Sequence, residues 1–168
     1  PEALITAYDP DNVDADTLRA AVSRADAANG YAESVLLRKD ADALLAMASD
    51  LDTLADVDAA MLRKVRFAKA NLHASREEVA EARKIYEMLA ADVSNVEGAE
   101  SAYRVIEALF AEGKHDESEK RIYALADSKT PHSYWLGKAF ILLGDIYVAR
   151  NDLFQAKATY RSVVDGYT

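Results

Sequence analysis

The sequence contains no cysteine and few of the residues that interrupt helices. Without thiols, disulfides, thiolate nucleophiles and cysteine-ligated metals are excluded. Only 6 glycines and 3 prolines occur in 168 residues, whereas alanine, the strongest helix former, is abundant. No stretch alternates polar and apolar residues for long enough to predict a sheet. The sequence therefore predicts an all-α fold.

Two further absences narrow the functional classes. No run of about 20 apolar residues is present, so we expect no direct membrane insertion in this segment. The net charge is −9, and a broad Lys/Arg surface of the kind that binds nucleic acid is missing. A local basic cluster at residues 63–69 has two interpretations, a patch that seats a carboxylate or a solvated helix face paired with nearby glutamates.

Motifs that carry chemistry are also missing. Four acidic residues near the N-terminus resemble a calcium loop, but a loop beginning at Asp9 has Val13 at its fifth position and Ala20 at its twelfth, where oxygen ligands are needed. The three histidines, His73, His115 and His132, lack metal-ligand spacing, and no Gly-x-Ser-x-Gly sequence occurs. We expect no enzyme, metal or cofactor, although a Ser/His/Asp triad assembled in space stays open.

The clearest local pattern is a helical hairpin near the C-terminus. Thr130-Pro131 predicts a helix start, since proline is tolerated in the first turn. Arg150-Asn151-Asp152 predicts a turn with Asp152 as the N-cap of a second helix. Small residues, Gly144 and Ala156, lie where the two helices are expected to touch.

The same pattern recurs upstream at intervals of about 36 to 38 residues, which is typical of a solenoid of helix pairs. Gly113 predicts a left-handed break after one helix, and residues 75–78 predict a capping box before another. In the N-terminal third, Asn29-Gly30 lies either inside one helix or at a break between helices at 17–28 and 31–38.

These residues resemble the tetratricopeptide repeat. The last repeat carries the consensus positions best, with Phe140, Leu143, Gly144, Tyr147, Ala156, Tyr160 and Val163. Ile106 and Ser118 depart from the small residues of the consensus. The resemblance implies a right-handed α-α superhelix with a remnant of a preceding repeat and linker at 1–24, a degenerate repeat at 25–62, and repeats at 63–98, 99–136 and 137–168. Similar long bacterial proteins are associated with the cell envelope, which implies a periplasmic or envelope location.

In such repeats the first helices line a concave groove that holds a protein or peptide. Carried onto this sequence, the groove positions are Lys64, Phe67, Asn71, Glu100, Tyr103, Glu107, Phe110, Lys138, Ile141, Asp145 and Val148. The large apolar members either contact a partner or pack against the next repeat. Tyr134 and Trp135 are open to the same two interpretations. Self-association through a terminal repeat that lacks a polar capping helix is the alternative function.

Overall fold

A computed structural model describes residues 26–27, 29–33, 35–36, 43–46 and 58–166. All regular structure in these ranges is helical, and no strand occurs within them. The all-α prediction is therefore confirmed. The chain divides into two compact units, residues 1–72 and 73–168, which are described separately.

The first unit has a small core. Helix α4 (Ala59–Ser75) contributes Val65, which packs with Ala32, Val35 and Leu44. Asp58 begins α4 because its side-chain Oδ1 accepts a 2.6 Å hydrogen bond from the Ala60 N–H.

The other predictions for the N-terminal third can be compared with the structure only where its residues are described. Asn29 and Gly30 are both helical, so no break occurs at that dipeptide. The predicted remnant at 1–24, with the acidic residues of the calcium-loop pattern, lies outside the described residues.

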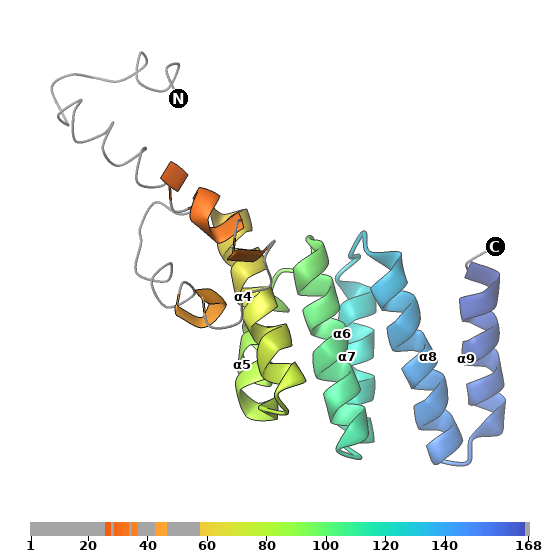
Figure 1. Cartoon of the computed structure of the whole chain (residues 1–168). Coiled ribbons are helices and arrows are strands. Elements are labelled where there is room, and N and C mark those ends of the chain that lie inside the picture. Colours follow the sequence, from red (N-terminus) through yellow and green to blue (C-terminus); the bar gives the residue numbers. More distant parts are fainter. Residues whose placement is uncertain (1–25, 28, 34, 37–42, 47–57, 167–168) are drawn as a thin grey trace, which may run out of the picture. The chain divides into compact units, whose positions relative to one another are not determined.

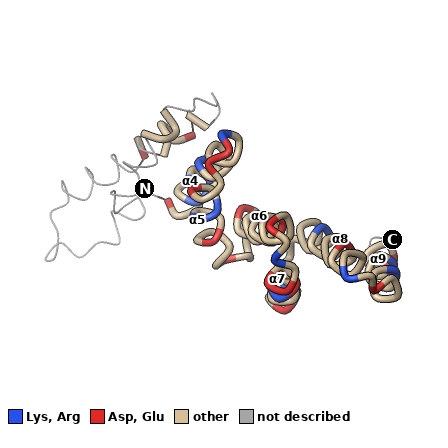
Figure 2. Tube along the Cα trace, turned by 90° about the horizontal axis from the view of Figure 1, so that it is seen from below, with Lys and Arg blue, Asp and Glu red and all other residues tan. Residues whose placement is uncertain are grey.

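The second unit contains five helices in sequence, α5 (Val79–Leu89), α6 (Val96–Ala111), α7 (His115–Asp127), α8 (Ser133–Ala149) and α9 (Leu153–Gly166). Helices α6 and α7 form one antiparallel pair, and α8 and α9 form another (Figure 1). We call α4, α6 and α8 the first helices and α5, α7 and α9 the second helices. The first helices α6 and α8 lie side by side, and α7 packs against both of them (Figure 2).

The spacing of the helices is regular. The first helices begin at Ala59, Val96 and Ser133, at intervals of about 37 residues, in agreement with the predicted period. The predicted repeat edges at 63, 99 and 137 fall a few residues inside these helices.

Each first helix is joined to its second helix by a three-residue turn whose middle residue is left-handed. These residues are Glu77 (φ 62°), Gly113 (φ 73°) and Asn151 (φ 60°). The predictions of a turn at 150–152 and of a left-handed Gly113 are confirmed. The Asp152 cap is confirmed as well, because its Oδ1 accepts a 3.1 Å hydrogen bond from the Gln155 N–H.

Two predicted helix starts are wrong. Ser75 is the last residue of α4, and Glu78 itself occupies the N-cap of α5 without a side-chain cap, so no capping box forms. The Glu78 carboxylate instead lies 2.5 Å from His73 Nδ1. Thr130 lies three residues ahead of α8, and its hydroxyl donates to the Val93 carbonyl at 2.7 Å, which joins two loops rather than capping a helix.

Small residues set the closest helix contacts of this unit. A Cβ placed on Gly144 would overlap the Tyr160 ring, and Ala156 is almost fully buried. Ser118, which departs from the repeat consensus, is fully buried and donates a 3.2 Å hydrogen bond to the Ile106 carbonyl. A polar side chain is thus accommodated at this contact because the preceding helix offers it an acceptor.

Candidate functional site

Helix α8 presents the predicted groove residues Lys138, Ile141, Asp145 and Val148 as one stripe. Tyr134 extends this stripe, because the five residues recur three or four positions apart and therefore share a face of the helix. Tyr134, Ile141 and Val148 are 60%, 45% and 47% exposed. Large apolar groups left open along one helix face, with charged residues between them, are typical of a surface that takes a partner.

The adjoining face of α6 carries an ion-pair network. The Arg104 guanidinium bonds the Glu100 carboxylate at 3.1 Å and the Glu107 carboxylate at 3.2 Å. Burial lowers the pKa of Arg104, but the hydrogen bonds to Glu107 and Glu100 outweigh it, so the net pKa is raised. Glu100 and Glu107, two of the predicted groove residues, are therefore partly neutralised by an arginine of their own helix.

Two interpretations were open for Tyr103, contact with a partner or packing against the next repeat, and the structure shows the packing. Tyr103 is only 4% exposed and belongs to the core cluster formed by α6, α7 and α8. Its ring lies 5.6 Å from the Trp135 ring, and its hydroxyl donates a 2.9 Å hydrogen bond to Glu107. Burial, together with that hydrogen bond, raises the pKa of Tyr103. Its groove position was carried over from the repeat register that the resemblance implies, and that register does not show whether the next first helix covers the ring.

Lys138 joins the α6 and α8 faces into one surface. Its ammonium lies 4.3 Å from the centre of the Tyr103 ring and 5.3 Å from that of Trp135. Cations at this distance from aromatic rings are attracted by the ring quadrupole. Trp135 is half-buried against the core, as the packing interpretation predicts, whereas its neighbour Tyr134 stays exposed. Tyr134, Ile141 and Val148 are exposed on these two faces, and the charged side chains beside them are half-buried. Together they form what we call the α6–α8 surface: Glu100, Arg104, Glu107, Tyr134, Lys138, Ile141, Asp145 and Val148.

Asp145 and Phe110 have internal partners. The Tyr160 hydroxyl of α9 donates a 2.5 Å hydrogen bond to Asp145. Burial, followed by this hydrogen bond, raises the pKa of Tyr160 to about 12. Phe110 is half-buried and stacks on His115, with ring centres 5.3 Å apart. These two predicted groove residues thus also serve the packing of their own helix pair.

The remaining predicted groove residues lie on α4, in the first unit. Lys64 and Asn71 are exposed, and Phe67 is half-buried. Because they belong to the first unit, they are not placed relative to the α6–α8 surface, and their membership of a common groove stays a prediction.

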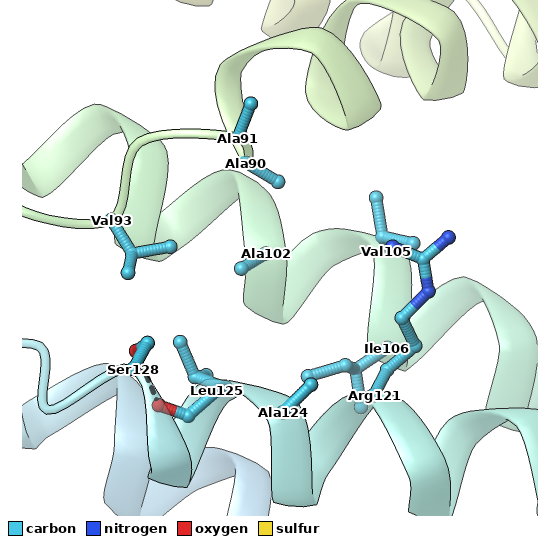
Figure 3. Close-up of a pocket in the computed structure, with 10 residues that line it drawn as sticks. All are labelled: Ala90, Ala91, Val93, Ala102, Val105, Ile106, Arg121, Ala124, Leu125 and Ser128. Carbon is cyan, nitrogen blue, oxygen red and sulfur yellow. Dashed lines mark hydrogen bonds between the residues drawn. The ribbon is translucent and has the colours of Figure 1, made fainter.

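A separate apolar pocket opens between α6 and α7 and the loop that precedes α6. It has a volume of about 170 Å³, and its apolar lining consists of four alanines together with Val93, Val105, Ile106 and Leu125 (Figure 3). Arg121 lies at one end and Ser128 at the other. The Ser128 hydroxyl donates to the Leu125 carbonyl at 2.6 Å, so it closes the end of α7 rather than pointing to a ligand.

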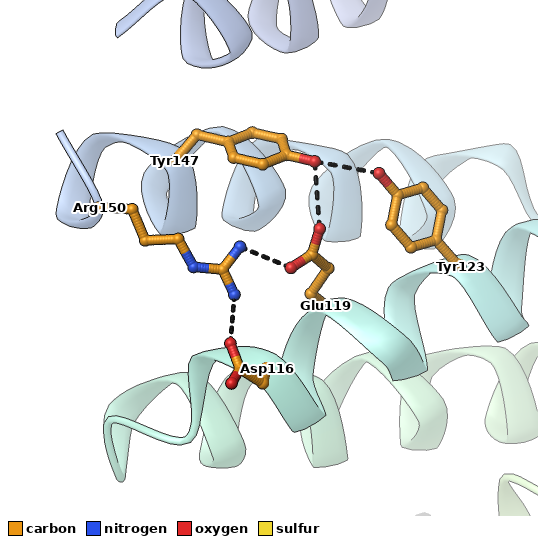
Figure 4. Close-up of polar contacts among 5 residues, drawn as sticks. All are labelled: Asp116, Glu119, Tyr123, Tyr147 and Arg150. Carbon is orange, nitrogen blue, oxygen red and sulfur yellow. Dashed lines mark hydrogen bonds and ion pairs between the residues drawn. The ribbon is translucent and has the colours of Figure 1, made fainter. Parts of the chain in front are cut away.

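A polar cluster ties α7 to α8. Arg150 bonds Glu119 at 2.6 Å and Asp116 at 2.5 Å, while the Tyr147 hydroxyl donates to Glu119 at 3.1 Å and lies 3.1 Å from the Tyr123 hydroxyl (Figure 4). The hydrogen bond with Tyr123, followed by burial, raises the pKa of Tyr147. Every charge in this cluster has an opposite partner, so we interpret it as a clamp between consecutive helix pairs.

The description of the chain covers residues 26–27, 29–33, 35–36, 43–46 and 58–166. Among those residues no group of three or more His, Asp or Glu side chains is placed to hold a metal ion. Among the same residues, no helix combines the length and apolar character that crossing a membrane requires.

Comparison with known proteins gives no relative. No model of a protein family, no curated protein and no solved structure matches this chain.

Proposed function

We propose that this chain is a tetratricopeptide-like solenoid that binds a protein or peptide on the α6–α8 surface. Support for the solenoid comes from the 37-residue interval, the repeated left-handed turn and the side-by-side packing of α6 and α8. Helix pairs of this kind bury their apolar faces by stacking on their neighbours, which leaves the outer face of the first helices available for recognition.

The observation that carries the binding role is the stripe of Tyr134, Ile141 and Val148. Their neighbours in the core, Ala139, Leu143 and Ile146, are at most 2% exposed, so α8 already has a buried face and does not need the stripe for packing. Rigid aromatic and aliphatic groups on a helix make effective contact area, because little conformational entropy is lost when they are covered.

The charges on the surface indicate what kind of segment fits. Arg104 offsets part of the charge of Glu100 and Glu107, and Lys138 is held over two rings. Glu107 is still 43% exposed, and it leaves one acidic edge beside the apolar stripe. The proposed partner is a helix or extended segment with apolar side chains and a Lys- or Arg-bearing edge. Its role is non-enzymatic, and the resemblance extends the proposal to assembly at the bacterial cell envelope.

The test is a selection from a random peptide display library on the full chain. Enriched peptides are expected to combine apolar and basic residues and to lose binding to the double variant Ile141→Asp/Val148→Asp. The matched control is Val79→Asp/Met88→Asp on α5, where the replaced side chains are 58% and 47% exposed. Peptides that bind the α8 double variant as well as the parent would refute the proposal.

A further inference from the structure

An ion pair between consecutive helix pairs occurs twice at the same position, with its polarity reversed. Arg83, the fifth residue of α5, bonds Glu112, the residue that follows α6, at 2.7 Å. Glu119, the fifth residue of α7, bonds Arg150, the residue that follows α8, at 2.6 Å. In each interface, the charge at the fifth position of the second helix is thus opposite to the charge on the residue that follows the packed first helix.

The hydrogen bonds of both ion pairs raise the pKa values of the two arginines. The hydrogen bond to Glu112 raises the pKa of Arg83, and the hydrogen bond to Glu119 raises that of Arg150. The pKa of the Glu112 carboxyl is lowered by Lys114 and by Arg83. The same two positions therefore carry opposite charges in both interfaces, although the arginine and the glutamate have exchanged places between them.

The fifth residue of α9 is Lys157, which is exposed. It forms no ion pair with any residue in 58–166. Phe154, Arg161 and Val164 lie three or four positions from Lys157 or from one another on the same face of α9, and we call these four residues the α9 stripe. The three additional residues correspond in position to Asp116, Tyr123 and Ala126 of α7. Asp116 and Tyr123 are residues through which α7 contacts α8.

The α9 stripe also has apolar area to cover. Phe154 is 81% exposed and Val164 is 63% exposed. Tyr160 and Val163 are half-buried, whereas the corresponding Ile122 and Leu125 of α7 are 0% and 4% exposed. Arg161 is paired with Asp165 at 3.9 Å, so the cationic character in the middle of the α9 stripe depends on Lys157, and both ends of the stripe are apolar.

We propose that the α9 stripe docks an amphipathic helix that carries a carboxylate at its C-terminal end, in the way that α6 docks on α5. The carboxylate pairs with Lys157, as Glu112 pairs with Arg83, and apolar side chains of the incoming helix cover Phe154 and Val164. This surface lies on a second helix and is independent of the α6–α8 surface.

A second copy of the chain is the alternative occupant of this surface, and sedimentation velocity tests it below.

The probe is a synthetic peptide of residues 95–114, which covers α6 and Glu112, together with the same peptide carrying Glu112→Arg. Each is titrated against the full chain and against its Lys157→Glu variant. The parent chain is expected to prefer the Glu112 peptide by about fivefold, since an exposed ion pair contributes up to about 1 kcal/mol. Lys157→Glu is expected to invert that preference, and 1 M salt to reduce it.

The variant Phe154→Glu tests the apolar part of the contact, and it is expected to weaken the binding of both peptides to the chain. Sedimentation velocity of the chain alone tests the second copy as occupant. Absence of saturable binding, equal affinity for both peptides, a preference that Lys157→Glu leaves unchanged, or a dimer that Phe154→Glu dissociates would each overturn the proposal. Since the α6–α8 surface is unchanged in these variants, its display-selected peptides report separately on the proposed function.

Discussion

At the scale of single residues, the close contact between α8 and α9 depends on the small side chains at Gly144 and Ala156. Gly144 leaves room for the Tyr160 ring, and the ring in turn directs its hydroxyl to Asp145. This arrangement explains why a glycine is placed in mid-helix, where it costs about 1 kcal/mol relative to alanine. The sequence pattern identified the small residue, but not the tyrosine that requires it.

Ala156→Leu is expected to destabilise the chain by about 1–3 kcal/mol, because the added atoms meet a close-packed contact. Ala156 is 3% exposed, whereas Ala158, on the same helix, is exposed. Ala158→Leu is therefore the matched control, with an expected change within about 0.5 kcal/mol. Urea unfolding followed by circular dichroism measures both. Equal effects of the two substitutions would show that the assignment of the buried face is wrong.

The raised pKa of Tyr160 leads us to expect a loss of folding stability at alkaline pH. Its pKa in the folded chain is about 12, above the value of about 10 for an unfolded tyrosine. Because the neutral form is favoured on folding, the contribution is complete below pH 10 and is lost as pH rises to 12. Tyr160→Phe should show a smaller fall in unfolding free energy across that window. A fall as steep as the parent's would assign the effect to other tyrosines.

At the scale of elements, the turn within each helix pair is the most regular feature of the fold. Gly113 adopts the left-handed conformation readily, whereas Glu77 adopts it at a cost of about 1 kcal/mol. Glycine could be recognised in the sequence because of this conformational freedom. Glu77 could not, because no side-chain property marks it, and the predicted capping box placed the turn incorrectly.

Glu77→Gly is expected to raise the unfolding free energy by up to about 1 kcal/mol, since relief of the strained backbone outweighs the greater freedom of the unfolded chain. The reverse change, Gly113→Glu, should lower it by a similar amount. Thermal unfolding of both variants checks the pair. Destabilisation by Glu77→Gly would indicate that the glutamate side chain, rather than the backbone, governs this turn.

The clamp between α7 and α8 predicts a charge-swap result. Arg150→Glu and Glu119→Arg are each expected to destabilise the chain by about 0.5–1.5 kcal/mol, because each places like charges together. The double swap reproduces the polarity of the Arg83–Glu112 pair and should recover about half of the loss, since Asp116 and Tyr147 keep their preference for the original arrangement. A double-mutant cycle at low and high salt measures the coupling. Strict additivity of the two changes would rule the clamp out.

At the scale of the whole molecule, the architecture was easier to predict than the binding surface. Helix period, hairpin turns and small contact residues depend on neighbours in the sequence, so they could be recognised from spacing. The ring partner of Tyr103 and the hydrogen-bond partner of Asp145 lie on other helices, and no local pattern reveals them. The Arg104 partner of Glu107, in contrast, lies three residues away on the same helix. Two of the eleven predicted groove positions, Ile141 and Val148, emerge as the open apolar contacts.

A partner segment that binds across α6 and α8 can be located by photo-cross-linking. A display-selected peptide that carries a benzophenone group is cross-linked to the full chain, and the attachment sites are mapped by mass spectrometry. We expect cross-links on the exposed stripe of α8 and on the neighbouring face of α6, and their loss in Ile141→Asp/Val148→Asp. Cross-links confined to α7 or α9, or unchanged in the double variant, would contradict it.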